Sequence, residues 1–221
     1  MTPRSKRQPG SRIDHRVRVA KARRENTQAR ILRSALRVFA ERGPDAPLID
    51  DFVRAAGIAR GTFYNYYRST TELLEATAAL LEDELIAAIE ARMANLTDPL
   101  ERLATGISLW LRRAEADPVW CRFVVRVRRR GPAVETSLGK DLRAGMQQGI
   151  FKIDSVEAGR DLVVGTLLEA MNRLAAGDAA PDHTVAIARS VLRGLGVNAQ
   201  RAEVVLRRAA IREAGKVGGT A

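Results

Sequence analysis

The sequence contains few of the residues that build catalytic and metal sites. Its 221 residues include one cysteine, Cys121, and two histidines, His15 and His183. A single cysteine excludes a disulfide within the chain and suits a reducing compartment, and beside Trp120 it is best interpreted as a buried small hydrophobe. Neither histidine has a partner at metal-site spacing, and no glycine-rich phosphate loop is present. We therefore expect no metal, no cofactor and no enzymatic activity.

Long apolar runs and strand patterns are also missing. No apolar run approaches the ~18 residues that a membrane span needs. The basic start of the chain lacks the apolar segment of a secretory signal, so we expect a cytoplasmic protein without membrane contact. Sustained alternation of apolar and polar residues is absent, as are Asn-Gly and Asp-Gly hairpin turns. With 46% apolar residues the chain can still bury a core. The fold class predicted from these features is all-α.

The positive charge is concentrated at the start of the chain. The formal net charge is +11, and residues 1–24 hold nine Lys and Arg side chains against Asp14 alone. Such a block is often only a solvated tail. Next to a DNA-reading unit it favours phosphate binding, and Arg23 and Arg24 are then candidate DNA contacts. Because of Pro3, Pro9 and Gly10, we expect residues 1–24 to be a flexible basic arm.

Three helices follow the arm, and a glycine turn joins the last two. Apolar residues at helical spacing predict a helix that ends before Gly43-Pro44 and a second one from Ile49, closed by Gly57. The stretch "ARGTFYNYY", residues 59–67, then begins a third helix. Two helices joined by such a turn form a helix-turn-helix unit, whose second helix places its first residues in a DNA major groove.

The aromatic stretch divides into two faces. Phe63 and Tyr67 lie four residues apart, so we expect both to point into the core. The opposite face then carries the candidate DNA contacts, namely Arg60, Thr62, Asn65 and Tyr66, with Tyr64 at the flank. The alternative is a capped core hairpin that merely exposes its tyrosines.

The remainder of the chain reads as further helices that begin at prolines after capping residues. We expect helices near 99–115, 118–130, 132–148, 155–176, 182–195 and 198–213. The domain organisation predicted is an arm over 1–24, a three-helix helix-turn-helix domain over 25–72, and a larger helical domain over 73–221.

Residues 27–75 resemble the DNA-binding domain of the TetR family of transcriptional regulators. The segments that carry the resemblance are "ARILRSALRVFAERG" and "DDFVRAAGIARGTFYNYYRSTTELL". It implies a homodimeric repressor that binds a palindromic DNA operator and is released by a small-molecule effector. By resemblance, base edges meet Arg60, Gly61, Thr62 and Asn65, and phosphates meet Tyr64 and Tyr66. The alternative function is a nonspecific architectural DNA-binding protein.

Three positions depart from the family pattern. Pro47-Leu48 replaces the usual Thr or Ser at the start of the second helix, and Ala59 replaces a common Ser. Thr70 stands where members usually carry Lys at the DNA surface, so it is the candidate contact there. Each change removes a phosphate contact or a helix cap, and a lost cap costs about 1 kcal/mol. We expect a weaker hold on DNA from the core domain.

The larger domain must supply a pocket and a dimer contact. Its large apolar side chains are the candidate pocket residues, with ordinary core packing as the alternative: Trp110, Trp120, Phe123, Met146, Phe151 and Met171. "RVRRRG", residues 126–131, recognises an anionic ligand or is a solvated helix end. The resemblance implies that helices 155–176 and 182–195 form an intersubunit four-helix bundle; their apolar stripe is otherwise plain core.

Overall fold

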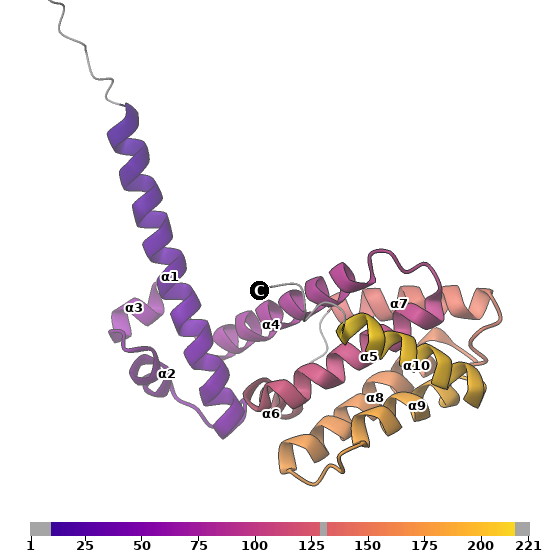
Figure 1. Cartoon of the computed structure of the whole chain (residues 1–221). Helices are drawn as coiled ribbons and strands as arrows, with labels where there is room; N and C mark the ends of the chain where they lie inside the picture. Colours follow the sequence, from indigo (N-terminus) through magenta and orange to yellow (C-terminus); the bar gives the residue numbers. More distant parts are fainter. Residues whose placement is uncertain (1–9, 129–131, 215–221) are drawn as a thin grey trace, which may run out of the picture.

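The computed structural model describes the backbone of residues 10–128 and 132–214, and the side chains of residues 17–128 and 132–212. Within these ranges the chain is built of helices, with no strand, as predicted (Figure 1). The helices are α1 (Gly10–Arg42), α2 (Ile49–Ala56), α3 (Arg60–Tyr64), α4 (Thr70–Met93), α5 (Pro99–Ala116), α6 (Pro118–Val127), α7 (Pro132–Gln147), α8 (Val156–Ala176), α9 (His183–Gly194) and α10 (Ala199–Ala214).

A small front domain forms where α2, α3 and the first turns of α4 pack against the second half of α1. Its core is aromatic: Phe39 and Phe52 are buried with ring centroids 4.8 Å apart, and Phe63 is buried beside them. Gly57 ends α2 in the left-handed conformation, with φ 59° and ψ 47°, which glycine adopts without strain. The predicted helix, glycine turn and helix are therefore confirmed.

The first helix is longer than predicted. Residues 10–24 continue α1 as helix, so the expectation of a flexible arm over 1–24 is wrong for them; residues 1–9 lie outside the described residues. Residues 11–24 contain no proline or glycine and are rich in the helix formers Arg, Lys and Ala. They extend a helix that the front core already holds, so no new helix nucleus is needed.

The front and rear domains share two helices. α4 starts at the Ser69 cap, whose Oγ accepts from Glu72 N at 3.1 Å, and it contributes Leu73 to the front core and Ile89 to the rear. α6 packs along α1, and its Phe123 enters the front core. The two domains are therefore joined by packed helices rather than by a loop.

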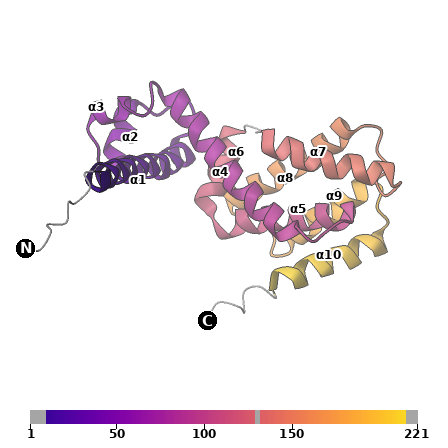
Figure 2. The same ribbon diagram turned by 90° about the horizontal axis from the view of Figure 1, so that it is seen from above.

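In the rear domain, α5 is the central helix, and α4 and α6 to α10 pack around it (Figure 2). The helix starts predicted at Pro99, Pro118 and Pro132 are confirmed, but α6 ends at Val127 rather than at the predicted residue 130, because Arg128 adopts the left-handed conformation. Fully buried leucines of three helices, α5, α7 and α9, form part of the core: Leu100, Leu111, Leu142 and Leu192. Across the part of the chain that the structure describes, no helix combines the length and apolar character of a membrane span.

Candidate DNA-binding surface and internal cavity

The short helix α3 presents one face to the core and one to solvent. Buried Phe63 and Tyr67 anchor it, as predicted, while Arg60, Gly61, Tyr64 and Asn65 are exposed and Thr62 is half-buried. A methyl group added at Gly61 would meet no atom within 4 Å. The glycine thus leaves open space on the outer face, where another molecule can approach the backbone closely.

Arg60 is held by an acidic residue that sequence reasoning missed. Its Nη1 donates to both carboxylate oxygens of Asp50 on α2, at 3.0 and 3.2 Å. A hydrogen bond with Tyr64 and the charge of Asp50 raise the pKa of Arg60. Both members of the ion pair are more than half exposed, at 58% and 61%, so the pair orients the arginine without burying it. The available signal was an acid in the first turn of the preceding helix.

Tyr66 and Arg24, two candidate DNA contacts, lie against each other. The Tyr66 hydroxyl donates to the Arg24 carbonyl at 3.2 Å, and the Arg24 guanidinium lies 5.6 Å from the ring centroid. Gln28 donates to the hydroxyl of neighbouring Tyr67 at 3.5 Å. These contacts fasten α3 to α1, so Tyr66 has a structural partner within the chain. Thr70 lies half-buried at the start of α4.

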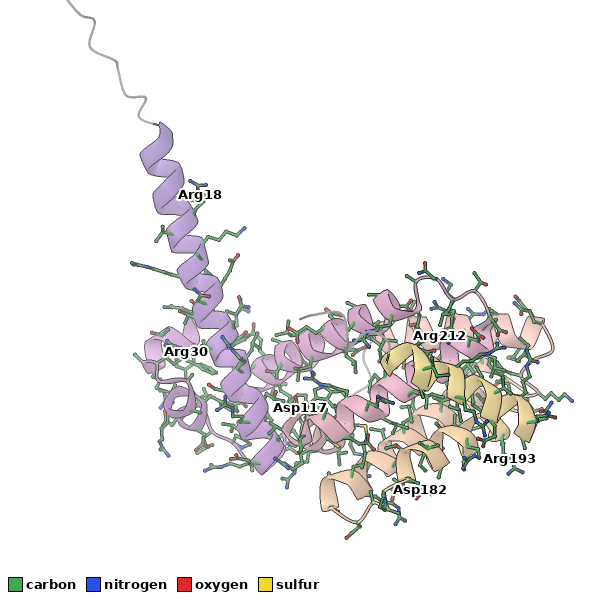
Figure 3. The ribbon with its side chains drawn as sticks, viewed as in Figure 1. Arg18, Arg30, Asp117, Asp182, Arg193 and Arg212 are labelled. Carbon is green, nitrogen blue, oxygen red and sulfur yellow. The ribbon has the colours of Figure 1, made fainter. Side chains whose placement is uncertain are left out.

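The first turns of α1 project beyond the front domain. Residues 17–24 are all exposed, and they include Arg18, Lys21 and Arg23. Figure 3 shows Arg18 on the free part of the helix, away from the other elements. At 1.5 Å per residue, the stretch from residue 10 to 24 reaches about 20 Å past the Tyr66 contact. The basic stretch is therefore a helical extension that continues past the front domain, rather than a loose arm.

The family departure at Pro47-Leu48 is compensated nearby. Leu48 is 72% exposed and offers no side-chain cap, but its backbone N–H donates to Asp51 Oδ2 at 2.9 Å. Asp51 also pairs with Arg42 at 2.9 Å, which ties the end of α1 to the start of α2. The acid in the first turn thus takes over part of the role of the missing Ser or Thr.

A cavity of about 460 Å³ lies within the rear domain, walled by α4 to α8. Three of the six candidate pocket residues line it, namely Trp110, Trp120 and Phe123, and the two indole rings are 5.6 Å apart. The other three lie elsewhere: Met146 and Phe151 pack into the helical core, and buried Met171 accepts from Trp110 Nε1 through its sulfur.

Much of the wall comes from α4, which sequence reasoning did not select. Its residues Leu85, Ile89 and Met93 line the cavity together with Gly106 and Val163 from α5 and α8. Aliphatic residues at helical spacing are the pattern of any core helix. No feature of the sequence distinguished these residues from those that pack solidly.

One end of the cavity is polar. Arg102 Nε donates to Asp141 at 2.7 Å, and its Nη2 donates to both oxygens of Glu90, at 3.2 and 3.0 Å. Burial raises the pKa of Asp141, and Arg102 offsets this only in part. Burial also acts to raise the pKa of Glu90, but hydrogen bonds from Ser137 and Arg102 outweigh it and leave that pKa lowered. Sequence reasoning missed this cluster, whose members are far apart along the chain.

Phe123 connects the cavity with the front domain. It lines the cavity, and its ring centroid lies 6.3 Å from that of Phe39 in the front core. Three residues further along α6, Arg126 donates to the Glu41 carbonyl near the end of α1 at 2.9 Å. Arg126 thus has a structural contact within the chain, while residues 129–131 of the "RVRRRG" stretch lie outside the described residues.

The apolar residues of α8 and α9 divide between core and surface. Met171, Val191 and Leu192 are buried within the chain, whereas Val185 is 53% exposed. A methyl group at Gly165 would meet no atom within 4 Å, so α8 offers a bare stretch of backbone to the outside. The two helices thus retain an open face after their own packing is complete.

Catalytic and metal chemistry finds little support among the described residues. No group of three or more His, Cys, Asp or Glu side chains there could hold a metal ion. Cys121 is buried, and burial raises the pKa of its thiol to about 11, so it is a poor nucleophile at neutral pH.

Two family models match the chain. Residues 31–77 match bacterial regulatory proteins of the tetR family, and residues 98–208 match the tetracyclin repressor-like C-terminal domain. Together with the helix-turn-helix and the hollow helical domain, they define the class: a two-domain DNA-binding regulatory protein. The chain belongs to the TetR family.

Several proteins are similar to this chain. An uncharacterized HTH-type transcriptional regulator of Mycobacterium tuberculosis is 32% identical over 108 residues, or 48% of this chain and 54% of that protein. The HTH-type transcriptional repressor KstR2 of Mycolicibacterium smegmatis is 29% identical over 107 residues, 48% of this chain and 44% of the repressor. The chain thus spans about half the length of the curated relatives it matches.

Among solved structures, RolR in complex with resorcinol is similar over most of the chain. It is 29% identical, with a TM-score of 0.63, and the match covers 85% of this chain and 96% of RolR. FadR of Bacillus subtilis in complex with stearoyl-CoA has a TM-score of 0.66 over 77% of this chain and 98% of FadR. At 23% identity, that likeness shows the fold alone.

Proposed function

We propose that this protein is a cytoplasmic transcriptional repressor, and not an enzyme, that leaves its DNA operator when a small molecule enters the rear cavity. The observation that carries the proposal is the position of Phe123. One side chain borders the cavity and also packs beside Phe39 in the core beneath the helix-turn-helix. A ligand that displaces Phe123 therefore acts on the front domain directly.

The coupling requires that the ligand favour one arrangement of α6 against α1. A ligand shifts an equilibrium only by its difference in affinity for the two states. The Arg126 to Glu41 hydrogen bond and the Phe123 contact both cross from α6 to α1. Moving α6 therefore moves α1, and with it α3, which Tyr66 fastens to α1.

The outer face of α3 is the surface that contacts the DNA bases in this proposal. Arg60, oriented by Asp50, is the base-contacting residue of the proposal, with Thr62 and Asn65 beside it. The basic extension of α1 lies along the phosphate backbone next to the half-site. A homodimer formed through the open faces of α8 and α9 places two such surfaces on a palindromic operator.

The effector is a small, largely apolar molecule. The cavity has the size and apolar wall of a small-molecule site. RolR, which is similar over most of this chain, was solved with the small aromatic molecule resorcinol. That likeness supports an aromatic effector here, because Trp110, Trp120 and Phe123 offer rings to stack against.

Selection of bound sequences from random DNA with purified protein tests the proposal. We expect a palindromic consensus sequence. Arg60→Ala should lower the discrimination against the wrong base by about 1–3 kcal/mol at one base pair per half-site. Arg143→Gln, an exposed charge change on α7, is the matched control and leaves the consensus unchanged. Recovery of no preferred sequence would establish the alternative, a nonspecific architectural DNA-binding protein.

A further inference from the structure

Two adjacent acids lie in the first turn of α2, and they make different contacts. Asp51 accepts from the Leu48 N–H at 2.9 Å and pairs with Arg42 at 2.9 Å, so it caps α2 and ties it to α1. Asp50 is directed at α3 instead, where both of its oxygens accept from Arg60 Nη1. The start of α2 is thus held by Asp51, while Asp50 joins the two helices of the helix-turn-helix at their outer side.

Stability gives little reason for the pair between Asp50 and Arg60. Both side chains are more than half exposed, and ion pairs that water surrounds contribute little to folding. The two helices are already held together by the buried rings of Phe52 and Phe63 and by the turn at Gly57. An effect of the pair is therefore expected at the surface of the domain rather than in its fold.

A carboxylate at this surface weakens DNA binding in general. Under the proposed function the outer face of α3 meets a duplex, whose phosphates repel a negative charge whatever the base sequence. Specificity, however, is a difference between affinities, and a group that penalises wrong partners increases it. Asp50 therefore benefits the proposed function only if it improves discrimination between sequences.

The contact leaves Arg60 the donors that a base requires. Of the five N–H donors of a guanidinium, two on Nη1 donate to Asp50 and a hydrogen bond with Tyr64 engages one more, which leaves two. Two donors are what a bidentate contact with guanine O6 and N7 needs. Because Asp50 fixes the side chain before DNA arrives, less conformational freedom is lost on binding.

We propose that Asp50 is a positioning residue, which holds Arg60 for a bidentate contact with one guanine in each half-site of the operator. This rests on the proposed function and adds to it the base that is read and the residue that enforces the choice. Without Asp50, the long side chain of Arg60 can also turn to phosphates, which every sequence offers. With Asp50 in place, a phosphate near Arg60 meets a carboxylate as well, so guanine is favoured over the backbone.

Selection of bound sequences from random DNA, with the full chain and two variants of Asp50, tests the proposal. We expect a guanine at one position of each half-site, and Asp50→Ala should lower its preference over the other bases about tenfold. Binding to DNA without the operator should stay the same or become tighter, because a negative charge is removed. Asp50→Asn keeps one oxygen for Arg60 Nη1 and should retain more of the preference. A guanine preference that Asp50→Ala leaves intact would overturn the proposal.

A double variant shows whether Asp50 acts through Arg60. Once Arg60→Ala has removed the guanidinium, adding Asp50→Ala should change the base preference no further. A change that persists without Arg60 would mean that Asp50 contacts a base itself, which contradicts a positioning role. The matched control is Asp45→Ala, which removes an exposed acid from the loop before α2 and should leave the guanine preference unchanged.

Urea midpoints separate positioning from a loss of fold. The midpoint of Asp50→Ala should stay close to that of the wild type, because the ion pair is largely exposed. A lower midpoint, together with an equal loss of affinity for operator and for unrelated DNA, would assign Asp50 a structural role only.

The positioning role can fail while the proposed function stands. If a palindromic consensus is found but contains no guanine that depends on Arg60, the positioning role fails and the repressor function remains. If the wild type selects no sequence at all, the repressor function fails and the reading of guanine fails with it.

Discussion

The front domain places aromatic rings in contact at its centre, whereas the rear domain contains a partly open cavity of about 460 Å³. Protein interiors are normally packed as densely as organic crystals, and a void forfeits contacts on every side. The front domain therefore holds a fixed shape for reading DNA. The rear domain leaves a region of its core unfilled, which agrees with the two roles proposed above for the two domains.

The largest effect on stability is expected from substitutions of two leucines on the same helix. Leu73 lies fully buried in the front core, and Leu85 borders the rear cavity, both on α4. Leu73→Ala should lower the free energy of unfolding by about 3–5 kcal/mol, because it creates a new cavity in a packed core. Leu85→Ala enlarges an existing space and should cost about 1 kcal/mol. Urea midpoints measure both, and equal losses would contradict the packing difference.

Two helical glycines probe the packing inside the rear domain itself. A methyl group at Gly145 would overlap the Phe151 ring, whereas at Gly106, on the cavity wall, its nearest atoms are 3.9 Å away. Gly145→Ala should therefore destabilise by about 1–3 kcal/mol. Gly106→Ala should stabilise by about 0.5–1 kcal/mol through its helix propensity. A loss of stability in Gly106→Ala would show that the wall is packed as tightly as the rest.

A smaller effect is expected where α3 meets α1. Tyr66→Phe removes the hydrogen bond to the Arg24 carbonyl, which contributes about 0.5–1.5 kcal/mol. Amide hydrogen exchange should then become faster over residues 17–24 while the rear domain is unaffected. Unchanged exchange, combined with weaker binding to all DNA sequences, would instead assign the Tyr66 hydroxyl to a phosphate.

The smallest change at physiological salt is expected from the exposed cations of the α1 extension. Arg18→Gln with Lys21→Gln removes two of them per chain, both exposed. Each phosphate contact contributes about −0.9 to the slope of log affinity against log salt, so a dimer should lose about 2–4 units of slope. Lys140→Gln with Arg143→Gln, an equal charge change on α7, should leave the slope alone. An unchanged slope in the α1 variant would mean that the extension stays clear of DNA.

The sequence predicted the front domain well because its signals are local. Each signal depends only on nearby residues: a glycine at the left-handed turn, a proline after the first helix, and two aromatics four residues apart. Gly57 adopts the left-handed conformation, and Phe63 and Tyr67 are buried, as expected. The α1 extension was mispredicted because the prolines and glycine at 3, 9 and 10 outweighed the helix-forming residues that follow them.

The cavity was predictable only in part. It exists where side chains of different helices do not fill the space between them, and this depends on the packing in three dimensions. Trp110 and Trp120 were chosen for their size and do line it, but Phe151, equally large, fills the space beside Gly145. The Arg102–Asp141 pair joins residues 39 positions apart. No local pattern indicates which of many arginines and aspartates form such a pair.

The extension of α1 bears on how the protein finds its target on a chromosome. If its cations bind phosphates, as proposed, they attract every stretch of the double helix alike and increase the time spent on the roughly 10⁶–10⁹ competing sites as well as on the operator. A longer stay on bulk DNA favours sliding and shortens each local search, yet it also withdraws molecules from the free pool. Under the proposed function, the number of copies a cell must hold to keep the operator occupied would be set partly by a helix that reads no bases.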